Sequence, residues 1–153
     1  MVLQKGVVMI KHILLPTDGS SLSERAIHQG IRLAKALDAQ VTGFCVIPQF
    51  HLFTYRTEIV EDTREQYSAD AKAHAERYLE VIERAARDAG VECRTEYVMN
   101  DQPAEAIVDE ASDRRCDLIA MASHGRSGMK GLLLGSVTHK VLTHSATPVL
   151  VYR

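Results

Sequence analysis

The chain has 153 residues, of which 46% are hydrophobic and 25% are charged, and its formal net charge is −2. This length suits a single domain, residues 1–153, that folds without disulfides or a structural metal. The nearly balanced charge and the 5% content of aromatic residues disfavour a nucleic acid or a membrane surface as the partner.

Strand-like and helix-like patterns alternate along the chain. Apolar runs of strand length are followed by longer segments in which apolar residues recur at helical spacing. In chain order, we expect a strand over 12–18, a helix over 21–37, a strand over 41–47, a helix over 58–89, a strand over 91–99, a helix from Pro103, a strand over 117–122, a helix over 135–144 and a strand over 148–152.

Local signals support these boundaries. Ser21 and Glu24 have the spacing of a capping box, and Gly90 is suited to end the long second helix. The third strand carries charged residues on one parity, which predicts a sheet edge with one face in water. The inner face of the second helix is expected to consist of Ala71, Ala75, Tyr78, Ile82 and Ala86.

This alternation predicts an α/β fold. Because helices connect successive strands, the five strands are expected to be parallel in one doubly wound sheet, with helices on both faces. We expect the strand order 3-2-1-4-5. In this order the first and fourth strands are neighbours, and the winding of the sheet reverses between them.

Three separated cysteines, Cys45, Cys93 and Cys116, lack the paired spacing of metal or redox sites. We expect them to be buried free thiols, as in proteins of the reducing cytoplasm. The amino terminus has only a four-residue apolar stretch, over 7–10, and no later run reaches transmembrane length. We therefore expect a cytoplasmic protein.

Two turns that follow strands combine glycines with polar residues that could bind a ligand. One covers residues 16–20 after the first strand, and the other covers 123–134 after the fourth. The second turn has three glycines and two bases, and Gly135-Ser136 then begins a helix. Because a helix N-terminus offers unpaired N–H groups and a partial positive charge, this segment predicts a phosphate-binding loop.

The same residues resemble the universal stress protein family. In that family, a strand-end glycine, two residues, a second glycine, nine residues and then Gly-Ser or Gly-Thr wrap the ribose and phosphates of ATP. Here the pattern falls on Ala122, Gly125, Gly135 and Ser136. The resemblance extends to residues 13–20, 46, 123–125 and 148–151, and so covers essentially the whole chain.

The resemblance implies a site for ATP, ADP or AMP, with Mg²⁺ as a candidate companion ion. Pro16, Thr17 and Asp18 would line the adenosine end, and Val46 would present main-chain groups to adenine. The implied site residues are Pro16, Thr17, Asp18, Val46, Met121, Ala122, Ser123, His124, Gly125, Gly135, Ser136 and Val137.

The phosphate end of the implied site lies in the glycine pattern. Ala122 and Gly125 would flank the ribose and first phosphates, and N–H groups of 135–137 would bind the outer phosphates. Ala122 stands where the family has glycine. An extended main chain is available to alanine, whereas a positive φ would disfavour it.

Other interpretations stay open. Asp18 is also suited to be a turn former, and Arg126 and Lys130 are equally suited to be solvated loop charges. No catalytic triad, Walker motif or metal-ligand spacing is present. We therefore expect a nucleotide-dependent binding module of the stress response, with at most slow ATP hydrolysis. The alternatives are a slow ATPase or nucleotidyl-type enzyme, and an interaction protein that binds no nucleotide. In the family the last strand, 149–152, pairs with its twin, which implies a homodimer.

Overall fold

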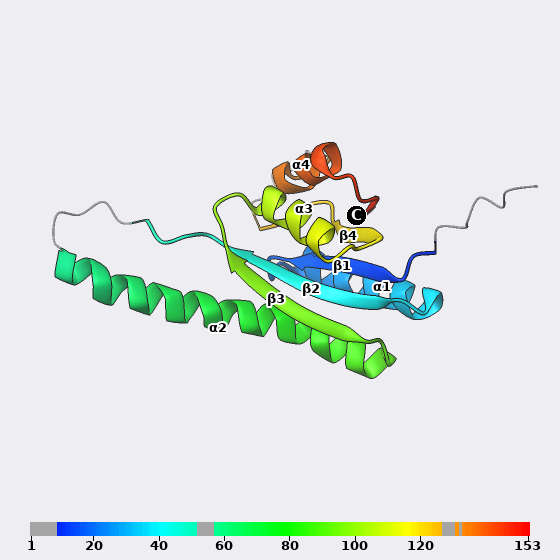
Figure 1. Cartoon of the computed structure of the whole chain (residues 1–153), viewed down its shortest axis with the longest axis horizontal. Helices are drawn as coiled ribbons and strands as arrows, with labels where there is room; N and C mark the ends of the chain where they lie inside the picture. The colour runs from blue at the N-terminus through cyan, green and yellow to red at the C-terminus, as the bar shows by residue number, and fades with distance from the viewer. Residues whose placement is uncertain (1–8, 52–56, 127–130, 132) are drawn as a thin grey trace, which may run out of the picture.

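The structure is a computed structural model that describes residues 9–51, 57–126, 131 and 133–153 (Figure 1). The described residues form one five-stranded parallel sheet in the order β3-β2-β1-β4-β5, which confirms the predicted fold class and strand order. The elements are β1 (His12–Thr17), α1 (Ser21–Leu37), β2 (Gln40–Ile47), α2 (Thr57–Ala89), β3 (Cys93–Met99), α3 (Pro103–Asp113), β4 (Leu118–Ala122), α4 (Ser136–His144) and β5 (Val149–Tyr152).

Helices cover both faces of the sheet, and each face has its own apolar core. Side chains alternate between the faces along each strand. Ile13 and Leu15 of β1 therefore pack with α1 and α2 in one cluster, whereas Leu14 packs with α3 and α4 in the other. All three side chains are fully buried. Burial on both faces explains why the sequence of β1 is continuously apolar.

The beginning of α1 differs by one residue from the expected capping box. Ser20, and not Ser21, is the N-cap, and its side chain accepts a hydrogen bond of 3.2 Å from the Ser23 N–H. Glu24 lies in the first turn, where its charge favours the positive end of the helix. Only Ser21 has the capping-box spacing to Glu24, whereas Ser20 is followed three positions later by Ser23 and caps the helix with its own hydroxyl.

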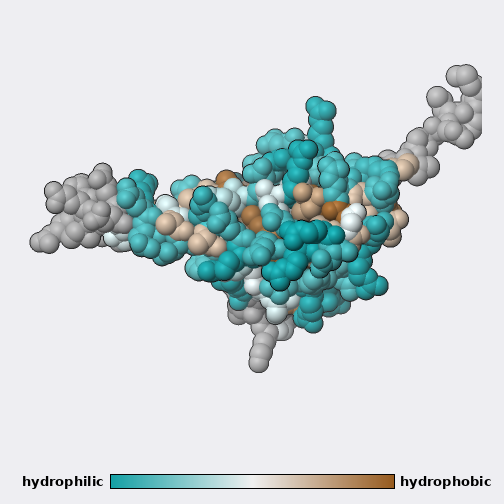
Figure 2. Space-filling model, turned by 90° about the horizontal axis from the view of Figure 1, so that it is seen from below, coloured by the Kyte–Doolittle hydropathy of each residue, from teal (hydrophilic) through white to brown (hydrophobic). Residues whose placement is uncertain are grey.

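The helix α2 ends as predicted. Gly90 has a φ of 69°, and the next residue, Val91, donates to the Ala86 carbonyl across the helix end. The first turns of α2 extend beyond the end of β3 (Figure 1). Figure 2 shows the face on the α2 side, which is mostly hydrophilic with apolar side chains gathered near its middle.

The two edges of the sheet are β3 and β5. The prediction that β3 is an edge strand is confirmed. Cys45 and Cys116 are buried, but Cys93 is only half-buried, so its predicted burial was wrong. The cause is its place on this edge strand, beyond which the described residues form no further strand. Among the described residues, no helix is long and apolar enough to cross a membrane. The sequence over 49–57 has no clean helical or strand period and is expected to be a loop. Its residues 52–56 lie outside the described residues, as do Gly128 and Lys130.

Candidate functional site

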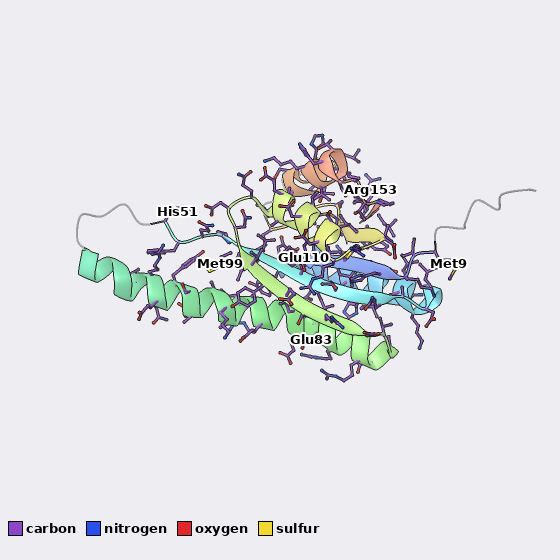
Figure 3. The ribbon with its side chains drawn as sticks, viewed as in Figure 1. Met9, His51, Glu83, Met99, Glu110 and Arg153 are labelled. Carbon is purple, nitrogen blue, oxygen red and sulfur yellow. The ribbon has the colours of Figure 1, made fainter. Side chains whose placement is uncertain are left out.

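The site is at the carboxyl ends of β1 and β4, which are adjacent parallel strands. Their following loops therefore leave the same edge of the sheet, at the point where the winding reverses. Figure 3 shows this polarity. Met9, which precedes β1, lies at one end of the sheet, whereas His51, which follows β2, and Met99, the last residue of β3, lie at the other end. The predicted meeting of the two polar turns thus follows from the strand order.

Asp18 connects the two loops. Its Oδ1 accepts a hydrogen bond of 2.9 Å from the Ser20 N–H, and its Oδ2 accepts one of 2.8 Å from the Arg126 N–H. The first bond is a local Asx turn. The second spans 108 residues of sequence. Asp18 is therefore both a turn former and the link between the β1 loop and the β4 loop.

Gly125 allows this close approach. A Cβ placed on Gly125 would lie 2.3 Å from Asp18 Oδ2, which is far inside van der Waals contact. Any larger residue would push the carboxylate away from the Arg126 N–H. The need for glycine at this motif position is thus a need for space and not for a positive φ, because Gly125 is not among the residues with positive φ.

Pro16 and Thr17, the last two residues of β1, support the first loop. Both are buried at the end of β1. The Thr17 hydroxyl oxygen accepts hydrogen bonds from the Gly19 N–H at 3.1 Å and from the Ser23 hydroxyl at 2.9 Å. The side chain of Thr17 therefore fixes the turn that presents Asp18.

The beginning of α4 has unpaired N–H groups. Its N-cap is Gly135, which has no side chain to bond the first turn. The N–H groups of the first helical residues, Ser136 and Val137, have no partner within the helix. The Gly135 N–H differs from the expected phosphate donor, since it donates to the Ser123 carbonyl at 2.7 Å. That bond holds the helix start against the end of β4.

Ala122 is the last residue of β4 and has an extended conformation without positive φ. Alanine therefore occupies this position, where the resemblance implies a glycine, without backbone strain. Its carbonyl accepts a buried 2.8 Å hydrogen bond from the hydroxyl of Thr138, a residue that is only 2% exposed. The side chain of Met121 is also buried. Thr138 joins α4 to β4 and was not predicted, because a threonine on a helix carries no signal of what its hydroxyl contacts.

His124 has a buried, unpartnered ring nitrogen. Its Nδ1 lies 3.1 Å from the Ser123 hydroxyl oxygen. Among the described part of the chain, its Nε2 is the one buried side-chain nitrogen or oxygen without a hydrogen-bond partner. The Cα of His124 is 3.3 Å from where a Cβ on Gly135 would stand. An unsatisfied polar atom at this place is suited to a polar ligand, since leaving it unpaired costs about 1–3 kcal/mol.

Val46 lies near the carboxyl end of β2, the strand next to β1. The last residue pair between β1 and β2 is Thr17 with Cys45, so Val46 lies one residue farther toward the carboxyl edge. Its half-buried side chain packs against the α3 and α4 core, while its main chain lies beside the first loop. Burial raises the pKa of the neighbouring Cys45 thiol to about 11, and the Asp18 charge adds to this rise. Cys45 is therefore a neutral thiol near pH 7.

Comparison with known proteins agrees with this geometry. The sequence profile of the Universal stress protein family matches residues 9–153. The chain belongs to this family. Universal stress protein MJ0531 of Methanocaldococcus jannaschii is 32% identical over 152 residues, which cover 99% of this chain and 87% of the relative.

Two solved structures relate the fold to this family. The structure of the hypothetical protein MJ0577, a universal stress protein of the same archaeon, has a TM-score of 0.78 and 33% identity over 94% of this chain and 96% of its own. A universal stress protein from Archaeoglobus fulgidus, in complex with dAMP, shares the fold with a TM-score of 0.62 at 18% identity, over 95% of this chain and 99% of its own.

The residues of this universal stress protein fit an adenine nucleotide in their donor chemistry. The first turn of α4, which has no side-chain cap, begins at Gly135 against the main chain of His124, and its N–H groups suit the oxygens of a phosphate. No group of three His, Cys, Asp or Glu residues that would hold a metal ion exists within the described ranges. Asp18 is the one carboxylate of the two loops as far as the structure describes them.

Proposed function

We propose that this universal stress protein binds ATP, ADP or AMP at the carboxyl ends of β1 and β4. The observation that carries the proposal is the glycine-capped start of α4, which has no side-chain cap and whose Gly135 lies against the main chain of His124 at the end of β4. Backbone donors that are already placed bind phosphate without reordering the chain. The A. fulgidus protein bound to dAMP supports an adenine nucleotide as the ligand.

In this proposal the ligand spans the crevice from the first loop to α4. The adenosine end lies at Pro16, Asp18 and the main chain of Val46, and the phosphates lie at Ser136 and Val137. Met121, Ala122, Ser123, His124 and Gly125 form the floor between them, and Gly135 positions the helix through its bond to Ser123. A Mg²⁺ ion would be held mainly by the phosphates, with Asp18 as the one carboxylate that the described parts of the two loops offer.

We further propose that nucleotide binding and not fast turnover is the function. Hydrolysis requires a positioned water and groups that stabilise the developing charge. The described residues of the crevice provide phosphate donors and one carboxylate that is already bonded to two N–H groups. The protein then acts in the cytoplasm as a stress-response module whose partners distinguish its occupied and empty forms.

Nucleotide carried through purification tests the proposal. Mass spectrometry of the heat-released ligand is expected to detect an adenine nucleotide. In a thermal unfolding assay, ATP with Mg²⁺ at about 100 times Kd is expected to add about 2.7 kcal/mol of stability, or roughly 5–10 °C. Absence of both a bound nucleotide and a thermal shift would contradict nucleotide binding.

Two variants give this assay its specificity. Gly125→Asp places a second carboxylate beside Asp18, and its charge is expected to abolish the ATP-dependent shift. Ser112→Asp adds the same charge on an exposed position of α3, near the opposite edge of the sheet, and is expected to retain the full shift. An equal loss in both variants would mean that the effect is one of net charge and not of the site.

A further inference from the structure

Tyr78, on α2, contacts the first loop of the candidate site. Its ring lies so close to Gly19 that a Cβ on Gly19 would come within 2.3 Å of Tyr78 Cε1. Gly19 also has a φ of 76°, which L-residues rarely adopt. The loop that presents Asp18 thus packs against Tyr78. This residue belongs to α2, which is not part of the glycine pattern.

Tyr78 also holds the side chain of the second loop. The Arg126 Cζ lies 4.9 Å from the centroid of the Tyr78 ring, within the range of a cation–π contact. Arg126 Nη2 also donates a hydrogen bond to the Tyr78 hydroxyl oxygen. On the same helix, His74 stacks on Tyr78 with the ring centroids 6.3 Å apart and an interplanar angle of 11°. Both ends of Arg126 are therefore fixed, its N–H by Asp18 and its guanidinium by Tyr78.

Arg126 is the one lysine or arginine in the described part of the two loops. It follows Gly125, whose main-chain N is 3.8 Å from where a Cβ on Gly135 would stand. The main chain that carries Arg126 thus passes close to the start of α4, where the proposed phosphates bind, while its guanidinium rests on Tyr78. A guanidinium that is already held loses less side-chain freedom when an anion arrives, and therefore binds it more tightly than a free one.

We propose that Tyr78 is a positioning residue of the nucleotide site, which holds the Arg126 guanidinium in place for the phosphates. This inference rests on the proposed nucleotide binding and adds α2 to the site. It also makes a prediction about ligand choice. Arg126 should strengthen the binding of ATP much more than that of adenosine, which has no phosphate.

Isothermal titration calorimetry with ATP and with adenosine tests this inference in a double-mutant cycle. Arg126→Gln is expected to weaken ATP binding about five- to tenfold, as for one lost charge-assisted contact, and to change adenosine binding less than about twofold. Tyr78→Leu should weaken ATP binding by a similar factor. The double variant should bind ATP no more weakly than Arg126→Gln alone, because Tyr78 acts through Arg126.

A third variant and two controls exclude a general loss of structure. Tyr78→Phe keeps the ring against Gly19 and below Arg126 but removes the hydroxyl, so ATP binding should stay within about threefold of the native protein. Tyr97→Leu changes an exposed tyrosine of β3, and Arg84→Gln removes an exposed cation of α2 that pairs with Glu80. Both controls should leave ATP affinity unchanged.

The outcomes separate this inference from the proposed function. If the native protein binds ATP but the effects of Tyr78→Leu and Arg126→Gln multiply, or reduce ATP and adenosine binding alike, Tyr78 has only a packing role and the inference is overturned. The same holds if neither variant changes ATP binding. If the native protein binds neither ligand, the proposed function itself fails, and the inference fails with it.

Discussion

At the scale of single residues, the candidate site depends on the carboxylate of Asp18 and on the absence of a side chain at Gly125. The sequence leaves two roles open for Asp18, and the structure assigns both to the same side chain, one to each oxygen. Oδ1 completes the turn with Ser20, and Oδ2 reaches the Arg126 N–H. The second bond exists because Gly125 leaves the space beside Oδ2 empty. The two residues therefore act as a unit.

Gly125→Ala tests this unit. The new methyl group would stand 2.3 Å from Asp18 Oδ2, so the carboxylate must move and the bond to Arg126 is lost. The free energy of unfolding, measured by urea denaturation, should fall by about 1–3 kcal/mol. Asp18→Ala alone should also destabilise the protein, because two N–H groups lose their acceptor.

The double variant Asp18→Ala with Gly125→Ala provides the control. Once the carboxylate is absent, the added methyl group meets no oxygen, so the loss of stability should be smaller than the sum of the two single losses. Strict additivity would show that the contact between Gly125 and Asp18 does not determine the cost of Gly125→Ala.

At the scale of elements, the position of α4 is fixed by polar contacts at its start. The Gly135 N–H donates to the Ser123 carbonyl, and the Thr138 hydroxyl donates to the Ala122 carbonyl. Both acceptors lie at the end of β4. The fully buried Val141 and the partly buried Val137 pack the helix against the core. The first turn of α4 is thus held at the carboxyl end of β4 by these bonds.

Thr138→Val should reveal this dependence. Valine has nearly the shape of threonine but cannot donate, so the Ala122 carbonyl loses a buried bond at a cost of about 1–3 kcal/mol in the free energy of unfolding. Thr143→Val is the matched control on the same helix, since its hydroxyl is exposed and contacts only the His139 and Lys140 carbonyls and the ring of the adjacent His144. It should cost less than about 0.5 kcal/mol. Equal losses for the two variants, measured by chemical denaturation, would contradict a special role for Thr138.

At the scale of the whole molecule, the features that can be predicted from the sequence are those that depend on the spacing of apolar residues, namely the strands, the helices and their order in the sheet. Continuous apolar runs identify strands that are buried on both faces, and the crossover helices impose the parallel order, so the place where the two polar loops meet is predictable. Contacts between distant elements are not encoded in this way. Tyr78 is expected on the inner face of α2, but nothing in the spacing of that helix indicates Gly19 or Arg126 as its neighbours. The same limit applies to the hydroxyl of Thr138 and to the exposure of Cys93.

The open edge of β5 concerns the assembly of whole molecules. The Ile119 N–H donates to the Pro148 carbonyl and the Ser123 N–H to the Tyr152 carbonyl, so the alternate residues Val149 and Val151 direct their own N–H and C=O groups away from β4. The four residues of β5 are half-buried and apolar. An edge of this kind is a template for a further strand, and the proposed occupant is the β5 of a second copy.

Val151→Pro tests the proposed homodimer. Proline removes an outward N–H and its ring obstructs a strand from a second copy, while the bonds between β4 and β5 remain. Sedimentation equilibrium should show a dimer for the native chain and a monomer, with at least a tenfold larger dissociation constant, for the variant. Thr95→Pro is the control, because Thr95 lies on β3 at the opposite edge and its change should leave the dimer intact. A native chain that sediments as a monomer, or a variant that dimerises as tightly as the native chain, would show that β5 does not pair with its twin.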